Sequence, residues 1–261
     1  MRIRYDHRVH AGNAGDLWKH FLLMEVADHL FRRDKSWTYV ESHTGSPEYR
    51  LGPGGEWEGG IGRFSSRLCD LRSFPYFEIL DEFNPKGVRR YFGSASLVLE
   101  LARMRNVPIG AELWDLDLRV RDEWDLCDDE RVHFHLGDGF SGAESLIESA
   151  NPALLLVDSP YIDEGDVKKA EDLICKAASS GRVVLCWHML GMGNAPHPSC
   201  DHEVFALEFQ RLGLDCGKWK GALMILGGND ENLAIRLDKR VDEFLQIIDK
   251  YGVWPCFSDG V

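Results

Sequence analysis

The sequence contains no apolar run long enough to cross a membrane. A spanning helix needs about 20 consecutive apolar residues, and the apolar stretches of this 261-residue chain are much shorter. Residues 1–7, Met-Arg-Ile-Arg-Tyr-Asp-His, also lack the apolar core of a signal peptide. We therefore expect a cytoplasmic protein that has no membrane partner.

Paired cysteines are also missing. The seven cysteines are scattered and none forms a C-x-x-C pair, so we expect reduced thiols rather than disulfides. The segment from His197 to His202 holds two histidines, a cysteine and an aspartate, a composition that could bind zinc. Because this is one short cluster without a second half, we expect no metal, and a metal-binding or structural role is kept only as an alternative.

Positive charge is scarce in this chain. The formal net charge is −13, which by itself argues against a nucleic-acid partner. The balance differs along the sequence, however. Residues 1–110 carry 16 basic and 14 acidic side chains, whereas residues 111–261 carry 14 and 29. A polyanion would therefore meet the N-terminal part of the chain.

The chain does contain short apolar segments that alternate with helical patterns. Their composition predicts strands at Trp37–Glu41, Val107–Leu113, Val132–Leu136, Leu154–Val157 and Val183–Trp187. Helical spacing predicts helices at Asn13–Arg33, Ala95–Arg105 and 166–179, capped by Asn13 or Asp16 in the first case and by Ser94 in the second. The alternation predicts an α/β fold, Rossmann-like and doubly wound, with a mostly parallel sheet of seven strands.

The C-terminal part and one internal segment depart from this alternation. After Trp187 we expect a helix near Glu203–Leu212, a hairpin of Ala222–Leu226 and Leu233–Leu237, and a closing helix at Val241–Tyr251. Residues 51–90 are rich in glycine and aromatic residues and predict a loop-and-helix insertion too short for its own core. We expect one domain over residues 1–261, with an N-terminal motif segment at 1–20.

Several predicted strands end in polar residues. The clearest case is Leu154–Val157, an unbroken apolar run typical of a strand buried on both faces, which leads directly into Asp158-Ser159-Pro160-Tyr161. Open α/β sheets bind ligands at the carboxyl ends of their strands. Other carboxylates that follow or end strands are Glu41, Glu112 and Asp138. Glu112, near the end of the second strand, could accept both hydroxyls of a ribose.

Two motifs and their order carry a family resemblance. Residues 5–20, Tyr-Asp-His-Arg-Val-His-Ala-Gly-Asn-Ala-Gly-Asp-Leu-Trp-Lys-His, are similar to the pattern Y-x-H-x-F-H-A-G-N-x-x-D-x-x-K-H, and Glu41-Ser42-His43-Thr44-Gly45 is similar to D/E-T-H-A-G. Gly93-Ser94, Glu112, Asp138-Gly139-Phe140 and Asp158-Ser159-Pro160-Tyr161 follow in the family's order. The chain thus resembles, over nearly its whole length, the RlmJ family of class I S-adenosylmethionine-dependent methyltransferases, which methylate N6 of an adenine in 23S ribosomal RNA.

The resemblance implies a cofactor, a substrate and a set of site residues. S-adenosylmethionine would be the cofactor and 23S ribosomal RNA the substrate, which Tyr5 would contact. Asp158, Ser159, Pro160 and Tyr161 would form the catalytic motif. The residues implied to line the cofactor pocket are Lys19, His20, His43, Ser94, Glu112, Asp138, Gly139 and Asp158.

The catalytic motif also makes chemical sense for an adenine amine. The lone pair of that nitrogen is delocalised into the ring, so acceptors for its two N–H bonds favour the tetrahedral, reactive geometry. The Asp158 carboxylate and the Ser159 carbonyl would be these acceptors, and Tyr161 would stack on the base.

The chain departs from the family pattern at two positions. Ser159 replaces the first proline of D-P-P-Y, which loses the fixed φ of proline but keeps the carbonyl. Pro47 stands where the family's glycine-rich loop has a glycine. Two alternatives stay open: the same chemistry on DNA or another amine, and a cofactor-binding protein that has lost catalysis. We expect a monomer without an obligate protein partner.

Overall fold

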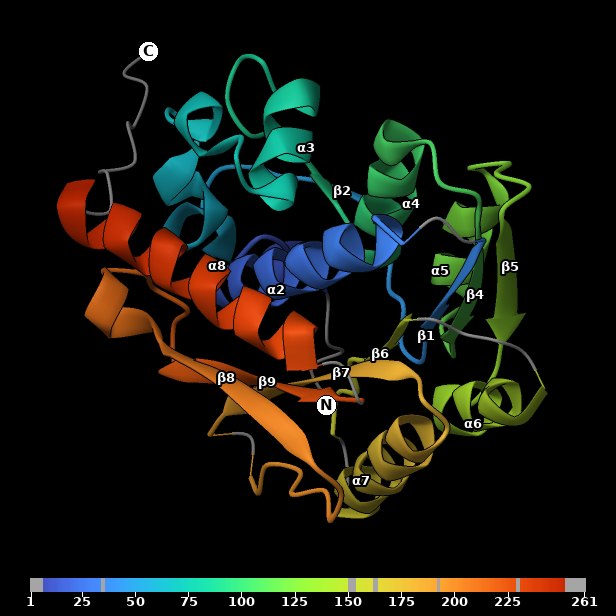
Figure 1. Ribbon diagram of the computed structural model, residues 1–261. Helices are drawn as coiled ribbons and strands as arrows, with labels where there is room; N and C mark the ends of the chain where they lie inside the picture. The colour runs from blue at the N-terminus through green and yellow to red at the C-terminus, as the bar shows by residue number, and fades with distance from the viewer. Residues whose placement is uncertain are drawn as a thin grey trace, which may run out of the picture.

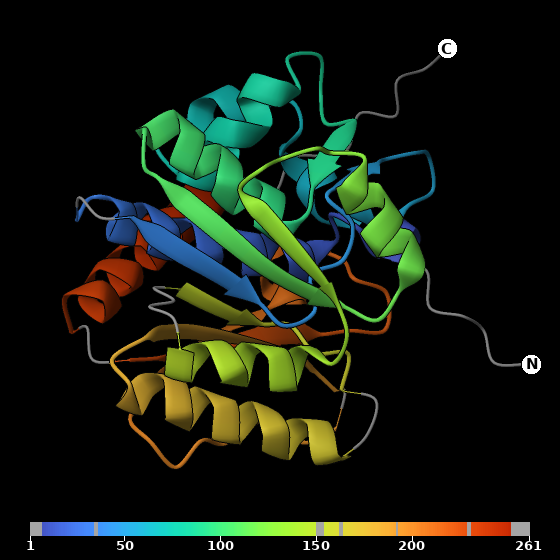
Figure 2. The ribbon, with the colours of Figure 1, turned by 90° about the vertical axis from the view of Figure 1, so that its right-hand side faces the viewer.

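The computed structural model describes residues 7–33, 36–149, 154–161, 164–191, 193–228 and 231–251. Within these ranges a seven-stranded sheet is enclosed by helices on both faces (Figures 1 and 2). No helix of the described ranges is long and apolar enough to cross a membrane. The strands of the main sheet are β1 (Trp37–Glu41), β4 (Ile109–Asp115), β5 (Val132–Leu136), β6 (Leu154–Val157), β7 (Val183–Leu190), β8 (His202–Glu208) and β9 (Gly221–Gly227).

The sheet has the order β5-β4-β1-β6-β7-β9-β8. The pairs β5–β4, β4–β1, β1–β6 and β6–β7 are parallel, whereas β9 runs antiparallel to both β7 and β8. The strand order reverses between β1 and β6, which makes their carboxyl ends the topological switch point where such sheets bind ligands. The predicted Rossmann-like, mostly parallel sheet of seven strands is confirmed.

The helices divide between the two faces of the sheet. Helices α2 (Ala14–Phe31), α3 (Pro75–Phe83), α4 (Ser94–Arg105) and α8 (Glu231–Tyr251) share one core with strand residues such as Tyr39, Leu113 and Leu156. Helices α6 (Gly139–Ser149) and α7 (Glu164–Ser179) share the other core with Val40, Leu155 and Val157. Neighbouring residues of β6 therefore point into different cores, as expected for a strand buried on both faces.

Helix α2 lies at the centre of the first core, where α8 crosses it in Figure 1. All but one of its residues are buried, because α3, α4 and α8 pack around it. Asn13 caps its start by accepting a hydrogen bond from the Asp16 backbone N–H, as the sequence predicted. The shorter helices are α1 (His7–His10) and α5 (Leu118–Asp125).

The segment between β1 and β4 contains a small antiparallel pair of strands. Strands β2 (Glu48–Arg50) and β3 (Arg90–Phe92) pair with Tyr49 opposite Tyr91. Between them lie helix α3 and the 3₁₀ helices η1 (Glu56–Gly59), η2 (Ile61–Phe64) and η3 (Leu68–Leu71). The loop-and-helix character expected for residues 51–90 is present, and its aromatic residues Phe64, Phe74 and Phe77 pack on Phe244 of α8.

Two expectations for the C-terminal part are wrong. The segment predicted as a helix near Glu203–Leu212 is strand β8 followed by the 3₁₀ helix η4 (Phe209–Leu212). Its buried residues Phe205, Leu207 and Phe209 recur at every second position, the period of a strand. Leu233–Leu237 belongs to α8, not to a hairpin, because Leu233, Leu237, Phe244 and Ile248 recur at helical spacing and are buried together.

Candidate active site

Asp158 follows β6 at the switch point and is held by a buried lysine of α2. The Lys19 Nζ lies 2.7 Å from Asp158 Oδ2 and 2.9 Å from Asp16 Oδ1. The Lys19 side chain is 5% exposed, whereas that of Asp158 is 20% exposed. Burial opposes the charge of this ammonium, but the two carboxylates outweigh burial and raise the Lys19 pKa well above its usual value. The result is a permanently charged group that fixes the orientation of Asp158.

The N-terminal motif builds the support for this lysine. Asp16 Oδ2 accepts a hydrogen bond from the Gly12 backbone N–H, and its own backbone N–H donates to Asn13 Oδ1. Asn13 Nδ2 in turn donates to Glu56 of the insertion. The spacing of Asp16 and Lys19 places both on one face of the first turns of α2. The motif Gly12-Asn13-x-x-Asp16-x-x-Lys19 therefore acts as one hydrogen-bonded unit that ends at Asp158.

Glu41 ends β1 as a fully buried carboxyl group without a basic partner among the described hydrogen bonds. Tyr39 Oη donates to Glu41 Oε2 at 2.8 Å, and Ser94 Oγ donates to Oε1. Burial raises the pKa of Glu41 to about 8, although both hydroxyl groups act in the opposite direction. Ser94 is the first residue of α4, and the capping position is taken by Gly93. The expectation that Ser94 caps this helix is wrong, because its hydroxyl is used to hold Glu41.

The loop after β1 is packed closely against the loop after β5. A Cβ on Gly139 would lie 1.5 Å from the Ser42 carbonyl oxygen, so only glycine fits there. Gly45 has a φ of 66°, and its N–H donates to Asp115 Oδ2 at 3.2 Å. His43 lies between these loops, with its ring edge-on to Phe140 and its Nδ1 2.9 Å from Ser42 Oγ. Burial lowers the pKa of His43.

The same loop contains a polar atom that suits a ligand. Thr44 is 5% exposed, and its Oγ1 has no hydrogen-bond partner among the described residues. A buried hydroxyl without a partner is unfavourable by roughly 1–3 kcal/mol. A ligand with polar groups at the carboxyl ends of β1 and β4 would satisfy it. The donors and acceptors present here therefore fit a nucleoside-containing cofactor.

Residues 158–161 form a tight turn. Ser159 Oγ accepts a hydrogen bond from the Tyr161 backbone N–H at 3.1 Å. Tyr161 has a φ of 48°, a left-handed conformation that is unusual outside glycine and asparagine. Its hydroxyl donates to the Trp187 carbonyl at 3.0 Å, and the residue is 9% exposed. The serine hydroxyl thus orders this turn, a task that proline at the same position could not perform.

The remaining expected residues differ in their partners and burial. His20 is buried against Tyr91, whose hydroxyl lies 2.8 Å from His20 Nδ1. Asp138 accepts from the Ser141 N–H at the start of α6, and this bond is the main cause of its lowered pKa. Pro160 is exposed. Tyr5 lies outside the described residues.

Glu112 does not lie at the end of its strand, where the sequence had placed it. It sits in the middle of β4, and its carboxylate oxygens lie 2.9 Å from His133 Nδ1 and 2.6 Å from His135 Nε2 on β5. Strand β4 continues to Asp115, two residues beyond the predicted end. Asp115 is therefore the carboxylate at the strand end, beside Gly45. The sequence signal for it was the pair of aspartates at 115 and 117, of which Asp117 caps α5.

His188 is a further residue that the sequence did not single out. It lies near the carboxyl end of β7 and is 1% exposed, with its ring edge-on to Tyr161 at 4.8 Å. Neither ring nitrogen has a hydrogen-bond partner among the described residues. Burial lowers the His188 pKa, which favours the neutral ring. No sequence pattern marks such a histidine, because only the fold places it beside the turn.

Comparison with known proteins identifies the family. The family model described as "Ribosomal RNA large subunit methyltransferase D, RlmJ" matches residues 34–187, more than half of the chain. The chain belongs to the RlmJ family. The resemblance to this family that the sequence motifs indicated is thereby confirmed.

Two individual members of the RlmJ family align with this chain over part of their length. The ribosomal RNA large subunit methyltransferase J of Haemophilus influenzae is 30% identical over 192 residues, which cover 69% of this chain and 65% of the relative. The protein of the same name from Escherichia coli is 28% identical over 170 residues, or 61% and 59%. The chain thus aligns with less than two thirds of each relative.

A solved structure shares the fold over nearly the whole chain. A crystal structure of a Legionella pneumophila protein superposes with a TM-score of 0.70 and covers 95% of this chain and 96% of its own. The sequence identity is 18%, so the likeness concerns the fold alone.

Proposed function

We propose that this chain is an S-adenosylmethionine-dependent methyltransferase that methylates N6 of an adenine in 23S ribosomal RNA. The observation that carries the proposal is the Asp158 carboxylate, held by Lys19 at the switch point of the sheet. One oxygen, Oδ2, receives the lysine, which leaves Oδ1 as the acceptor for an amine. Family membership supports the ribosomal substrate.

The cofactor would lie across the loops that follow β1, β4 and β5. Gly45, Thr44 and His43 offer close backbone approach and an unused hydroxyl. Asp115 and Glu112 are two candidates for holding the ribose, and Asp138 for receiving the adenine amino group. When bound, S-adenosylmethionine supplies an activated methyl group on a positively charged sulfonium.

The chain's own residues would act mainly by positioning the adenine amine. Asp158 and the Ser159 carbonyl would each accept one N–H, which favours the tetrahedral nitrogen and the positive charge that develops there. The turn at Ser159–Tyr161 fixes the direction of that carbonyl, because the Ser159 hydroxyl holds the Tyr161 N–H. Pro160, which is exposed, and Tyr161 behind it would meet the face of the base.

The direct test measures methyl transfer from labelled cofactor to unmodified 23S ribosomal RNA, followed by identification of N6-methyladenine. Asp158→Asn should reduce transfer by at least about 10²-fold, because the negative charge that stabilises the developing positive charge on the amine is lost. Cofactor binding, followed by thermal shift, should survive this substitution. Absence of any shift in the wild-type protein at saturating cofactor would rule the proposal out.

A matched pair of variants decides which carboxylate holds the ribose. Asp115→Asn should weaken cofactor binding more than Glu112→Gln, because Asp115 stands at the strand end beside Gly45 while Glu112 is engaged by two histidines. Calorimetric titration with S-adenosylhomocysteine measures both. A larger loss with Glu112→Gln would assign the ribose to Glu112 instead.

A further inference from the structure

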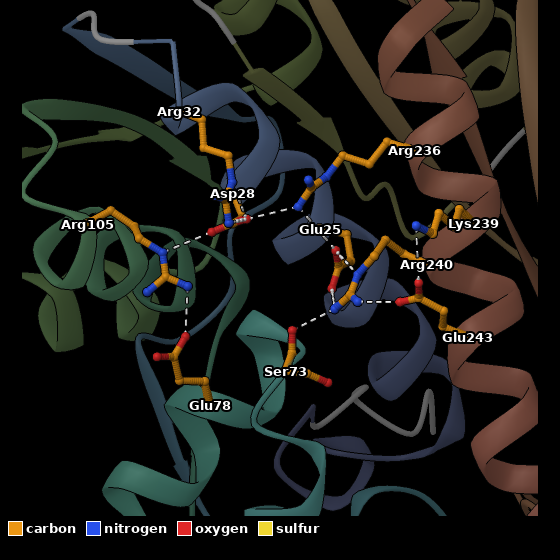
Figure 3. Close-up of polar contacts among 10 residues, drawn as sticks. All are labelled: Glu25, Asp28, Arg32, Ser73, Glu78, Arg105, Arg236, Lys239, Arg240 and Glu243. Carbon is orange, nitrogen blue, oxygen red and sulfur yellow. Dashed lines mark hydrogen bonds and ion pairs between the residues drawn. The ribbon is translucent and has the colours of Figure 1, made fainter.

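A cationic groove lies between α2, α3, α4 and α8, away from the candidate active site (Figure 3). Its volume is about 760 Å³. Asp28 and Arg105 lie near the C-terminal ends of α2 and α4, and these helices lead into the amino ends of β1 and β4. Asp28 follows Lys19 by nine residues, or about 14 Å along the axis of α2. The groove therefore faces the opposite edge of the sheet from Asp158.

Two buried carboxylates of α2 organise the arginines of the groove. Asp28 accepts from Arg32 at 2.8 Å, from Arg105 at 2.9 Å and from Arg236 at 3.1 Å. Glu25 accepts hydrogen bonds from two nitrogens of the Arg240 guanidinium, Nε at 2.8 Å and Nη2 at 3.0 Å. In Figure 3 the guanidinium groups of α4 and α8, together with that of Arg32 at the end of α2, converge on Asp28 and Glu25. The forks of these guanidinium groups are taken by carboxylates, so the network fixes the guanidinium groups as positive charge along the groove rather than as free phosphate donors.

Cations outnumber carboxylates along the lining of the groove. Its acidic lining residues are Asp28, Glu78 and Glu243, and its basic lining residues are Arg32, Arg72, Arg105, Arg236, Lys239 and Arg240. This excess stands out in a chain of net charge −13. Even with Glu25 behind the lining and Asp81 beside Arg72 counted, one positive charge remains. A concave surface of one sign attracts ligands of the other.

Donors remain available in the groove. At the rim, the side chains of Arg32, Arg72 and Lys239 are 63%, 52% and 76% exposed. The ion pairs of Arg72 with Asp81 at 3.4 Å and of Lys239 with Glu243 at 3.8 Å are long and solvent-exposed. Arg72 and Lys239 can therefore turn to a ligand at little loss.

We propose that this groove binds phosphate groups of the RNA backbone, as a second contact remote from the reacting adenine. The inference rests on the proposed function, because it takes RNA as the substrate. Cations spread along an open rim suit consecutive phosphates of a chain better than one small anion, which needs donors that converge on a point. Phosphate contacts position the nucleic acid and give its binding a strong salt dependence.

The test uses the rim cations, whose removal spares the buried network. Arg72→Gln combined with Lys239→Gln should weaken binding of a structured 23S fragment about tenfold at low salt and reduce the slope of log affinity against log salt by about 1.5. KM for that fragment should rise while kcat stays unchanged. Arg121→Gln combined with Lys168→Gln, two exposed ion-paired cations elsewhere, is the matched control and should change neither.

A gain of charge provides the reverse test. Asn232 lines the groove and is exposed, so Asn232→Lys should tighten binding of the fragment. Unchanged affinity and salt slope in the double variant, or equal losses in the control, would overturn the proposal. Inorganic phosphate that binds the groove without being displaced by the RNA fragment would also overturn it.

Failure of the groove and failure of the proposed function give different results. A wild-type protein that binds the fragment in a groove-dependent way but transfers no methyl group contradicts only the function. A wild-type protein that methylates RNA, with a double variant indistinguishable from it, contradicts only the groove.

Discussion

The two ends of α2 lie beside buried carboxyl groups that behave in opposite ways. Glu41, near the active-site end, and Asp28, in the groove, are 0% and 1% exposed. Burial raises the Glu41 pKa to about 8, because its hydrogen-bond partners are the hydroxyls of Tyr39 and Ser94. Burial acts in the same direction on Asp28, but Arg32 and Arg105 outweigh it and lower the pKa. Between these two carboxyl groups, the hydrogen-bond partners differ: Glu41 has only hydroxyl groups, whereas Asp28 has guanidinium groups that oppose the effect of burial.

The difference matches the ligands proposed for the two regions. At the sheet edge one ammonium, Lys19, serves two carboxylates, Asp16 and Asp158, so the local surplus is negative. Such a site suits a sulfonium and an amine that becomes positive. In the groove the surplus is positive and suits phosphate. One helix thus carries opposite electrostatic environments at its two ends.

The largest expected effect comes from Asp28→Asn. Three guanidinium groups would lose their shared negative charge, which should destabilise the protein by about 3–5 kcal/mol at pH 7. Because the folded pKa of Asp28 is lowered, its stabilisation is present above the unfolded value near 3.8 and is lost as the pH falls. Urea unfolding at pH 7 and pH 3 measures this difference. Asp122→Asn, at an exposed ion pair, should leave the unfolding midpoint unchanged.

Glu41→Gln should show the opposite pH dependence. The raised pKa of Glu41 stabilises the wild-type fold below the unfolded value of 4.5, and this contribution declines as the pH rises through about 8. Each pH unit in that window costs the wild type up to about 1.4 kcal/mol. The variant should therefore gain relative stability from pH 5 to pH 8 in urea titrations. If the stability of the two proteins changed equally with pH, Glu41 would not be a buried carboxyl group with a raised pKa.

His188→Phe tests the unpaired histidine beside the turn. Removal of two unpartnered buried nitrogens should stabilise the fold by about 1–2 kcal/mol. His188→Asn, which keeps unpartnered polar atoms at the site, should show no such gain in stability. A destabilised His188→Phe variant would mean that the ring nitrogens have partners in the folded protein.

Ser159→Ala should have the smallest effect. It removes the acceptor of the Tyr161 N–H, a hydrogen bond worth about 0.5–1.5 kcal/mol. We expect kcat for methyl transfer to fall modestly, because the Ser159 carbonyl becomes less rigidly placed. Ser159→Thr keeps the hydroxyl and should retain wild-type kcat. Equal losses in both variants would point to a steric effect instead.

Local sequence patterns predicted most strands of the sheet but not the edge strand β8. Trp37–Glu41, Val132–Leu136 and Leu154–Val157 appear as strands with the expected bounds, because their apolar and aromatic composition agrees with the turns that flank them. The segment at residues 202–208 failed, since its run of Val204, Phe205, Ala206 and Leu207 hides a period of two. The strand end at Asp115 was missed for a different reason. The β4 boundary depends on pairing with β5, which the local sequence does not show.

The sequence by itself determined the strand-helix alternation, the helix cap at Asn13 and the motif in which Asp158 follows a doubly buried strand. These depend on neighbours within a few positions. Only the tertiary structure decided that Lys19 reaches Asp158 across 139 positions, that Gly139 must leave room for Ser42, and that arginines of α4 and α8 converge on α2. Such contacts follow from the order and packing of the strands and helices, which no local pattern encodes.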